Sequence, residues 1–480
     1  MHVAQRVKEE NVGNELWKMG AVELARGIKE KRFKSREAVE AHLARIEEVN
    51  PQVNAVTVVL AESAIASADE ADKKTASGAD LGPLHGVPFT VKENIDLVGS
   101  PTTQGVHAMV EAFPPQDAPH IKQIKEAGAI PFGRTNLPDF GLRWHTDNDL
   151  RGATKNPWDA SRTPGGSSGG EAAALATGMT PLGMGNDLGG SLRWPSQCCG
   201  TTAIKPTLGR VAWASSLPPG DDPITIQLFA TQGPMARRVE DLRVALAAMA
   251  GYDARNPWWT PALPAGQTHA HPRKVAMAVD PGGAGVDDQV ADGVRKAGKV
   301  LADAGYEVEE VDLPRLIEAA QLWQDMVLTE VTTAMLPMIE PLVSDDARSF
   351  LGSTSDLRPT LDFAGYIQAF AQRQSIARDW QVFLDDYALV LGPVFTIRPF
   401  EVGYDLKGGK DGDDLTRAAR LTVAAGNLLG LPAVAVPVGV AEGLPQVVQL
   451  IGGRFREELC LDAAQAIEDS CGLLTPIDPK

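Results

Sequence analysis

Apolar residues recur at helical spacing in some segments of the chain and form short β-branched runs in others. Residues 14–49 carry the helical spacing, and Lys34-Ser35-Arg36-Glu37 within them resembles a helix start, so this segment predicts two helices. Asn54–Leu60 predicts a strand, and the Ala-rich segment 61–73 predicts a helix. Further strands are predicted at 88–92, 129–133, 273–279, 307–312, 387–392, 433–437 and 446–451, and further helices at 118–128 and 286–304.

This alternation of helices and short apolar strands is typical of α/β proteins with a mostly parallel or mixed sheet. We therefore expect an α/β fold in which one large mixed sheet is covered by helices on both faces. We found no convincing linker between domains, so the sequence predicts one domain over 1–480. An N-terminal helical part (1–75) and a helical region (315–385) are expected to pack on a core that includes 82–242.

Composition narrows the class of protein. The chain has 480 residues, of which 44% are hydrophobic and 22% charged, as in ordinary globular proteins. The net charge of −17 and the lack of a basic patch argue against nucleic-acid binding. No apolar run has the length of a membrane span, and the N-terminus lacks the apolar core of a signal peptide, so we expect a cytoplasmic protein without membrane contact. The four cysteines form neither a zinc nor a disulfide pattern.

Two glycine-dense loops that carry serines flank a short Ala-rich segment. The first contains Ser167 and Ser168, and the second ends in Gly189-Gly190-Ser191. A serine hydroxyl is a poor nucleophile until a base removes its proton, and neighbouring glycines free backbone N–H groups to face an oxyanion. The pattern predicts a serine hydrolase.

The usual bases do not fit these loops. Ser168 lies in a G-x-S-x-G match, but the required strand does not precede it and no histidine follows His271. No serine has a lysine three residues later, as penicillin-binding enzymes require. The eight histidines show no metal-ligand spacing, and the glycines at 183–189 do not match a dinucleotide loop.

Lys92 is the remaining candidate base. It ends the apolar segment 86–92, and burial there would favour its neutral amine, which can accept a proton near pH 7. A strand-end lysine paired with Glu93 or Asp96 is the alternative interpretation. Lys92 is favoured because two serine loops need a base and histidine is excluded.

Several motifs in collinear order resemble the amidase signature family, most densely between residues 82 and 242. They are HGVPFTVKENID (85–96), GRTNLPDF (133–140), GATKNPWD (152–159), PGGSSGGEAAALATG (164–178) and GNDLGGSLRWPSQCCGTTAIKPTLGR (185–210), with weaker similarity at 232–242, 425–439 and 443–458.

The resemblance implies the amidase signature fold and a Lys–cis-Ser–Ser triad. Ser191 would be the nucleophile, and Ser167, after a cis Gly166–Ser167 peptide, would relay protons between Ser191 and Lys92. The backbone N–H groups of Leu188, Gly189, Gly190 and Ser191 would form an oxyanion hole. These functions need no metal and no organic cofactor.

The resemblance also implies supporting roles. Ser168 would support the network by hydrogen bonding, and Asp187 and Arg193 would brace the nucleophile loop as an ion pair. Three positions depart from the usual family residues, namely Arg134, Asn186 and Trp194, and none of them is expected to touch the catalytic groups.

Substrate selection is expected to lie in the segment 138–145 and in the helical region 315–385, which would cap the pocket. Gly141 falls where the family brings backbone near the acyl group, and aromatic residues could line the pocket: Phe140, Trp144, Trp213 and Trp323. Small-molecule amides, anilides, esters and carbamates share the same carbonyl geometry, so the motifs do not separate them, and a urethanase is among the activities left open. A homodimer is one assembly that the sequence allows.

Two other functions remain open. The glutaminase subunit of a tRNA-dependent amidotransferase resembles the same family and would need partner subunits, but the segments 138–148 and 400–420 favour a free-standing amidase. An inert binding protein is disfavoured because Lys92, Ser167 and Ser191 are all present.

Overall fold

Strands drawn from most of the chain lie side by side in one sheet. The computed structural model describes residues 15–217, 222–262, 273–283, 285–355 and 359–480. Within these residues an 11-stranded sheet has the order β1-β3-β2-β4-β6-β5-β10-β11-β9-β7-β8. Its strands are β1 (Val56–Val59), β2 (Pro88–Lys92), β3 (Ile130–Thr135), β4 (Leu182–Asp187), β5 (Thr202–Lys205), β6 (Thr231–Ala236), β7 (Lys274–Met277), β8 (Glu307–Glu310), β9 (Leu389–Pro393), β10 (Ala433–Ala441) and β11 (Leu444–Gly452).

The sheet is mixed. Strand β2 runs parallel to its neighbours β3 and β4, and β7 runs parallel to β8 and β9. The remaining neighbours are antiparallel, including the long pair β10 and β11. Parallel neighbours need crossover connections, and helices supply them here. The predicted α/β class with a single mixed sheet is confirmed.

Helices occupy most of the connections. The α-helices are α2 (Ala21–Lys29), α3 (Ser35–Val53), α4 (Ala61–Ser77), α5 (Pro119–Glu126), α6 (Gly169–Ala176), α7 (Arg193–Cys199), α8 (Ile224–Phe229), α9 (Val239–Met249), α10 (Asp288–Asp303), α11 (Leu316–Glu330), α12 (Leu336–Ile339), α13 (Asp345–Ser355), α14 (Phe363–Asp386), α15 (Gly409–Ala418) and α16 (Glu457–Cys471). Two π-helices are η4 (Val331–Met335) and η6 (Thr422–Leu428), and short 3-10 helices are η1 (Leu16–Lys18), η2 (His107–Met109), η3 (Asp139–Gly141) and η5 (Tyr404–Leu406). None of the described helices is both long and apolar enough to cross a membrane.

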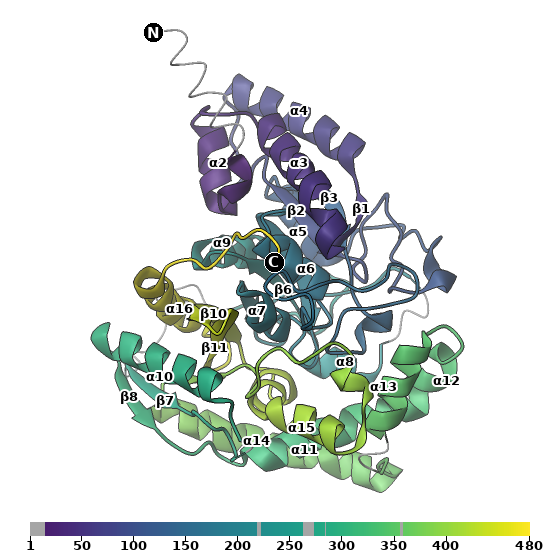
Figure 1. Cartoon of the computed structure of the whole chain (residues 1–480), viewed down its shortest axis with the longest axis vertical. Helices are drawn as coiled ribbons and strands as arrows, with labels where there is room; N and C mark the ends of the chain where they lie inside the picture. The colour runs from purple at the N-terminus through teal and green to yellow at the C-terminus, as the bar shows by residue number, and fades with distance from the viewer. Residues whose placement is uncertain (1–14, 218–221, 263–272, 284, 356–358) are drawn as a thin grey trace.

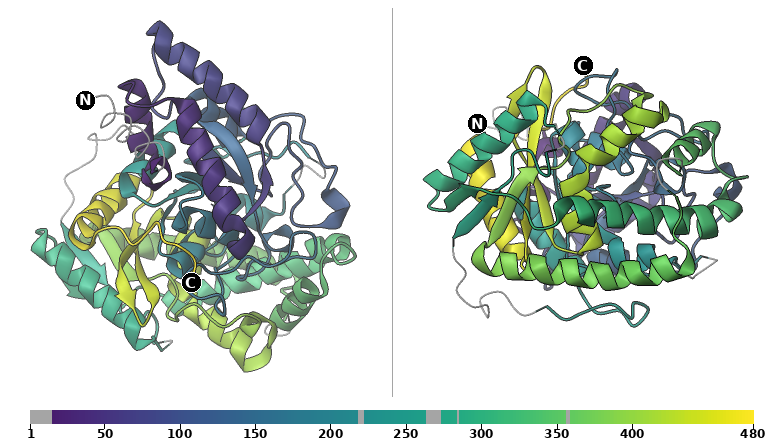
Figure 2. Two further views of the ribbon diagram at one scale, coloured as in Figure 1. Left: turned by 45° about the horizontal axis from the view of Figure 1, so that its top comes forward. Right: turned by 90° about the horizontal axis from the view of Figure 1, so that it is seen from below.

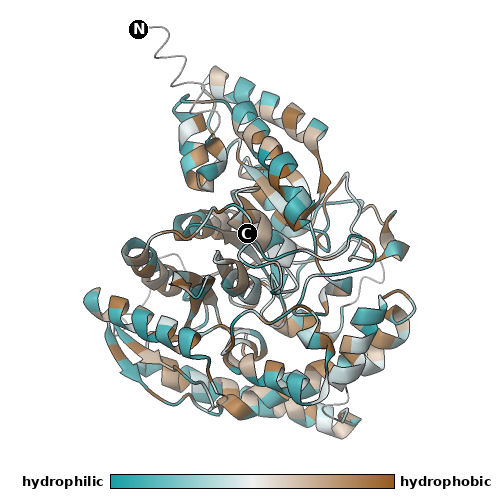
Figure 3. Cartoon of the chain, viewed as in Figure 1, coloured by the Kyte–Doolittle hydropathy of each residue, from teal (hydrophilic) through white to brown (hydrophobic). Residues whose placement is uncertain are grey.

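Successive strand residues belong to two apolar cores, one on each face of the sheet. In β2, Phe89 and Val91 pack into the core that includes α5, α9, α10 and α16. The other core includes residues of α6, α7, α11 and α14. Because side chains alternate along a strand, Thr90 and Lys92 point to this second face. Hydrophilic and hydrophobic residues are mixed along the outer helices, such as α10 (Figure 3).

The two outer groups of helices lie at opposite ends of the molecule. Helices α2, α3 and α4 gather at one end, whereas α11 to α14 lie at the other (Figure 1). Helix α14 packs along α11, and the two helices run beside each other (Figure 2, right). The expected division into parts 1–75, 82–242 and 315–385 stays a prediction, and residues 1–14 lie outside the described residues.

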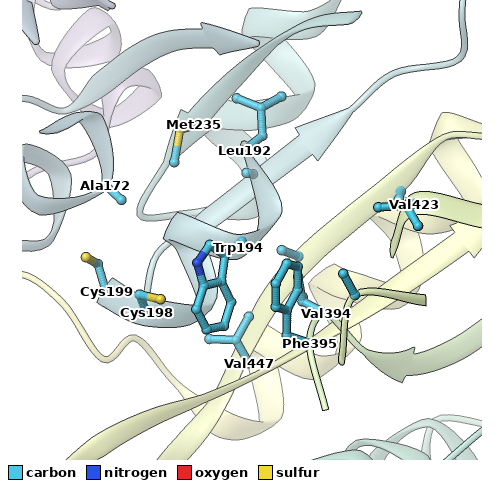
Figure 4. Packing of buried hydrophobic residues seen from close by; sticks show 14 of the residues in the cluster. Ala172, Leu192, Trp194, Cys198, Cys199, Met235, Val394, Phe395, Val423 and Val447 are labelled. Carbon is cyan, nitrogen blue, oxygen red and sulfur yellow. The ribbon is translucent and has the colours of Figure 1, made fainter. Parts of the chain in front are cut away.

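An aromatic stack fixes the segment that follows Ser191. Trp194, at the start of α7, stacks on Phe395 with a centroid distance of 4.3 Å, and both are fully buried (Figure 4). The Trp194 Nε1–H group donates to the carbonyl of Trp144 at 3.0 Å. The loop that carries Ser191 is thereby packed against the segment near residue 144, which carries the predicted pocket residues.

Three central strands were not predicted from the pattern: β4, β5 and β6. Strand β4 contains two glycines, and β6 contains Gly233 and Pro234, residues that are depleted in strands. Burial on both faces stabilises these segments as strands. For β4 and β6 the prediction failed because tertiary packing overrides local propensity, whereas β5 is a strand of only four residues.

Candidate active site

Lys92 is a buried lysine at the end of β2. Its side chain is fully buried, and its Nζ donates to Ser167 Oγ at 2.6 Å and to Asn186 Oδ1 at 2.9 Å. Burial lowers the pKa of Lys92 to about 7, although the charges of Asp187 and Glu171 act to raise it. Burial thus favours the neutral amine, which is the form that can accept a proton.

Ser167 lies in the loop that leads into α6. The Gly166–Ser167 peptide bond is cis. Ser168 follows as the residue before the helix, but its buried Oγ has no hydrogen-bond partner among the residues that the structure describes. The hydrogen bond expected from Ser168 is thus not present, whereas Ser167 contacts Lys92 directly.

Ser191 lies in the loop between β4 and α7. Gly190 before it has a φ of +97°, a left-handed conformation that favours glycine, and this turns the chain sharply at the end of β4. Ser191 is 7% exposed and lines a pocket. Its Oγ makes no hydrogen bond to any part of the chain that the structure describes. The geometry therefore joins Lys92 to Ser167 and leaves the hydroxyl of Ser191 free to face a ligand.

A fully buried ion pair supports this loop from behind. The guanidinium of Arg193 donates to both carboxylate oxygens of Asp187 at 3.0 Å. Burial alone would raise the pKa of Asp187, but the charge and hydrogen bonds of Arg193, with a bond from Asn427, hold it below its ordinary value. Arg193 also donates to Thr422 O at 3.1 Å and Gln449 Oε1 at 3.0 Å. Every charge in this group is thus compensated.

The backbone N–H groups of the loop differ in availability. The Gly190 N–H donates to Asp187 Oδ1 at 2.8 Å, so it is engaged. The N–H groups of Leu188, Gly189 and Ser191 make no hydrogen bond within the described residues. Unengaged N–H groups in a turn can bind an oxyanion. The predicted set of four donors is therefore reduced to three in this structure.

Glu171 is a site residue that sequence reasoning missed. Its fully buried carboxylate on α6 accepts hydrogen bonds from the hydroxyls of Thr90 on β2 and Thr135 on β3, the latter at 2.7 Å. Burial raises the pKa of Glu171 to about 7, against the effect of the two hydroxyls. Gly183 on β4 leaves room for this side chain. Glu171 thus ties the helix that follows Ser167 to the strand that carries Lys92. In the sequence, the only sign of a buried role for Glu171 was that it is a single carboxylate in an Ala-rich segment.

Asn186, which departs from the usual family pattern, contacts the amine of Lys92, contrary to the sequence-based expectation. Asn186 accepts from the Lys92 amine, and its own Nδ2 donates to Asn94 Oδ1 at 3.1 Å. Arg134 donates to the carbonyl oxygen of Lys92 at 3.1 Å. The expectation failed because Asn186 is on β4, adjacent to β2 in the sheet but distant in sequence. We refer to the following residues as the polar cluster: Lys92, Ser167, Glu171, Asn186, Asp187 and Arg193.

A pocket opens beside the polar cluster, and its lining is largely apolar. Ser191 lies in it together with Gly141 and Trp144, two of the predicted substrate-lining residues. Trp144 is held by a bond from its Nε1–H to Gly189 O at 2.9 Å. A further part of the lining comes from α11, η4 and α13. We call these residues the helical wall: Trp323, Gln324, Val327, Leu328, Val331, Met335, Phe350, Leu351 and Thr354.

Two of the predicted aromatic residues are not among those that line this pocket. Phe140 instead packs near Ile339 and Val343 on the outer side of the segment. Trp213 is elsewhere, where its carbonyl accepts from Asn256. The predicted cap region contributes through α11, η4 and α13, whereas α14 packs behind α11.

The chain belongs to the amidase family, whose model matches residues 37–461. It is 42% identical over 468 residues to an indoleacetamide hydrolase of Bradyrhizobium diazoefficiens, with coverage of 96% of this chain and 88% of the relative. The chain is therefore an enzyme that hydrolyses amide C–N bonds.

More distant similarities agree with this class. The chain is 33% identical to one of the subunits of the glutamyl-tRNA(Gln) amidotransferase of Moorella thermoacetica, covering 95% of this chain and 97% of that protein. Among solved structures, a bacterial aryl acylamidase of the amidase signature family superposes with a TM-score of 0.80 at 25% identity, covering 94% of this chain and 96% of that one. The expected amidase signature fold is confirmed.

Proposed function

We propose that this enzyme hydrolyses amides of hydrophobic, aromatic acids through an acyl-enzyme on Ser191. The observation that carries the proposal is the 2.6 Å contact between the buried Lys92 amine and Ser167, beside an apolar pocket lined by Ser191. A lysine whose pKa is lowered to about 7 can act as a base without histidine. The similarity to an indoleacetamide hydrolase supports an aryl acyl group.

In the proposed acylation, Ser191 Oγ attacks the amide carbon while its proton passes to Ser167 and the proton of Ser167 passes to Lys92. The oxyanion accepts hydrogen bonds from the free N–H groups of Leu188, Gly189 and Ser191. The C–N bond then breaks, and the proton returns through Ser167 to the leaving nitrogen. Water repeats the sequence to release the acid and restore Ser191. These steps use the chain's own residues, with neither a metal nor a cofactor, and they apply equally to anilides, esters and carbamates.

The pocket favours a free-standing amidase over the glutaminase subunit. Glutamine carries an α-ammonium and an α-carboxylate, and both need charged or strongly polar partners when buried. Arg143 is the charged residue of the lining, and it is already paired with Asp405 at 3.0 Å and with Asp346. An apolar lining without a free charge suits an aromatic acid. A cytoplasmic location and a homodimer stay predictions.

Active-site labelling tests the proposed nucleophile. A fluorophosphonate probe should label the wild type at Ser191 but not the Ser191→Ala variant, with the modified peptide located by mass spectrometry. Ser168→Ala is the matched control and should retain labelling. Labelling that persists in Ser191→Ala, or is absent from the wild type, would contradict the acyl-enzyme.

A substrate panel then tests the proposed class. Purified protein is offered indole-3-acetamide, an anilide, an ester and a carbamate of comparable size, and L-glutamine, with products read by mass spectrometry. We expect turnover of the arylacetamide and negligible glutaminase activity. Glutaminase activity that rises sharply when amidotransferase partner subunits are added would establish the alternative.

A further inference from the structure

Gln324 is a polar residue of the helical wall, and its closest pocket-lining neighbours on α11 are apolar. Gln324 is 7% exposed and lines the pocket, yet its amide makes no hydrogen bond to any described residue. Because this side chain is almost entirely enclosed and has no partner within the described residues, its amide can bond only to water or to a ligand in the pocket. Such a group in a ligand pocket indicates a partner supplied by the ligand.

The other polar side chains of the pocket wall are already engaged. Thr225 donates to Glu330 at 2.6 Å, and Trp144 donates to Gly189 O at 2.9 Å. Thr354 and Thr416 donate to carbonyls of their own helices at 2.7 and 3.1 Å. The Trp323 indole N–H also lacks a partner among the described residues, but it is sealed from solvent. Apart from Ser191, the accessible hydrogen-bonding side chain left over in this lining is Gln324.

The position of Gln324 on its helix directs it toward the pocket. Residues three, four and seven positions further along, Val327, Leu328 and Val331, also line the pocket. Residues at these spacings share one face of a helix. Gln324 therefore interrupts an otherwise apolar stripe, and this stripe packs near the Ser191 loop, where Trp323 closely approaches Gly189.

We propose that Gln324 is a specificity-determining residue that accepts a hydrogen bond from an N–H donor in the aromatic ring of the acyl group, as in an indole. The inference rests on the proposed arylacetamide activity and adds a requirement to it. Ser191 acts on the amide at one place in the pocket, and Gln324 on the helical wall binds the ring heteroatom at another. The apolar residues around Gln324 contact the rest of the ring system and exclude water from this bond.

Paired substrates of matched shape test the assignment. Indole-3-acetamide has the ring N–H, and 1-benzothiophene-3-acetamide replaces it with sulfur, which cannot donate. The wild type should prefer the indole roughly tenfold in kcat/KM, because the analogue leaves the buried amide unpaired. In Gln324→Met, which keeps the side-chain length and removes the amide, the preference should fall to about one. Leu328→Met is the matched control on the same helix face and should keep the wild-type preference.

Binding provides a second measurement that does not depend on turnover. In the Ser191→Ala background, calorimetry should give a lower Kd for the indole than for the benzothiophene, and Gln324→Met should equalise the two values. An unchanged preference in Gln324→Met, or an equal loss in Leu328→Met, would overturn the role of Gln324 while leaving the arylacetamide activity intact. If the enzyme neither hydrolyses nor binds the two amides, the proposed substrate class is overturned, and the role of Gln324 with it.

Discussion

The polar cluster and the helical wall border the same pocket, but different interactions stabilise them. In the polar cluster, hydrogen bonds join buried charged and polar groups: they connect β2 to α6 and to β4, and β4 to α7. In the helical wall, apolar side chains pack from helices at one end of the molecule, and Gln324 is unpaired within the described residues. A network of directed bonds fixes a reacting geometry, whereas apolar packing tolerates changes of shape. The comparison suggests that the chemistry is fixed on the sheet and the substrate choice is set on the helices.

Loss of the proposed base should have the largest effect. Lys92→Met should lower kcat about 10⁴-fold at pH 7, since residues that act as a unit fail together. Lys205→Met is the matched control, because Lys205 is also fully buried on the sheet and burial lowers its pKa to about 7, while its Nζ donates to Pro206 O. Steady-state kinetics of both variants would show whether the loss of kcat is specific to Lys92, and circular dichroism would check that both variants are folded. A comparable loss in kcat for the two lysines would mean that burial, and not the contact with Ser167, is what matters.

Breaking the buried ion pair should cost stability on a scale that no surface pair matches. Asp187→Ala leaves the guanidinium of Arg193 buried and uncompensated, so we expect the free energy of unfolding to fall by about 3–5 kcal/mol. Glu70→Ala is the control, because Glu70 pairs with Lys73 on the surface, where such pairs contribute about 0–1 kcal/mol. Urea denaturation followed by fluorescence measures both. Equal losses in the free energy of unfolding would show that the buried ion pair matters no more for stability than a surface pair.

The pH profile should report the charges around Lys92. The proposed mechanism uses the neutral amine of Lys92, whose pKa is lowered by burial to about 7, so kcat/KM should rise about tenfold per pH unit below 7 and level off above it. Asn186→Asp places a carboxylate on the amine, which favours its charged form and should move this limb to higher pH. Glu171→Gln removes a charge that raises the pKa of Lys92 and should move the limb to lower pH. If the rising part of the pH profile shifted in the same direction in both variants, it would not report the titration of Lys92.

Changes in the helical wall should be the mildest. Val327→Ala removes two methyl groups from the pocket lining, so KM for an arylacetamide should rise several-fold with kcat nearly unchanged. Val58→Ala, outside the pocket lining, serves as the control and should leave KM unaltered. Steady-state kinetics would check both variants. If kcat fell while KM stayed constant, the wall would have a part in positioning the reacting groups.

The sequence predicted the parts of the molecule whose signals are local. Lys92, Ser167 and Ser191 could be proposed as a site because glycine-rich loops and an apolar strand end are visible in short stretches, and β1 is a β-branched run. Strands β4 and β6 were missed because glycine and proline hide them, and their stability comes from neighbouring strands. The contacts of Glu171 and Asn186 could not be read from spacing, because their partners are brought together by sheet order. The pocket role of Gln324 likewise depends on which residues around it are already bonded.

Arg193 has a consequence for how the enzyme is made. Its guanidinium is held by Thr422, Asn427 and Gln449, which are separated from it by 229, 234 and 256 positions. During synthesis the guanidinium of Arg193 can pair with Asp187 early, but it is fully hydrogen-bonded only after those distant partners have left the ribosome. The arrangement proposed for catalysis is therefore completed late in translation, and an isolated 82–242 fragment would carry Lys92, Ser167 and Ser191 without these partners of Arg193.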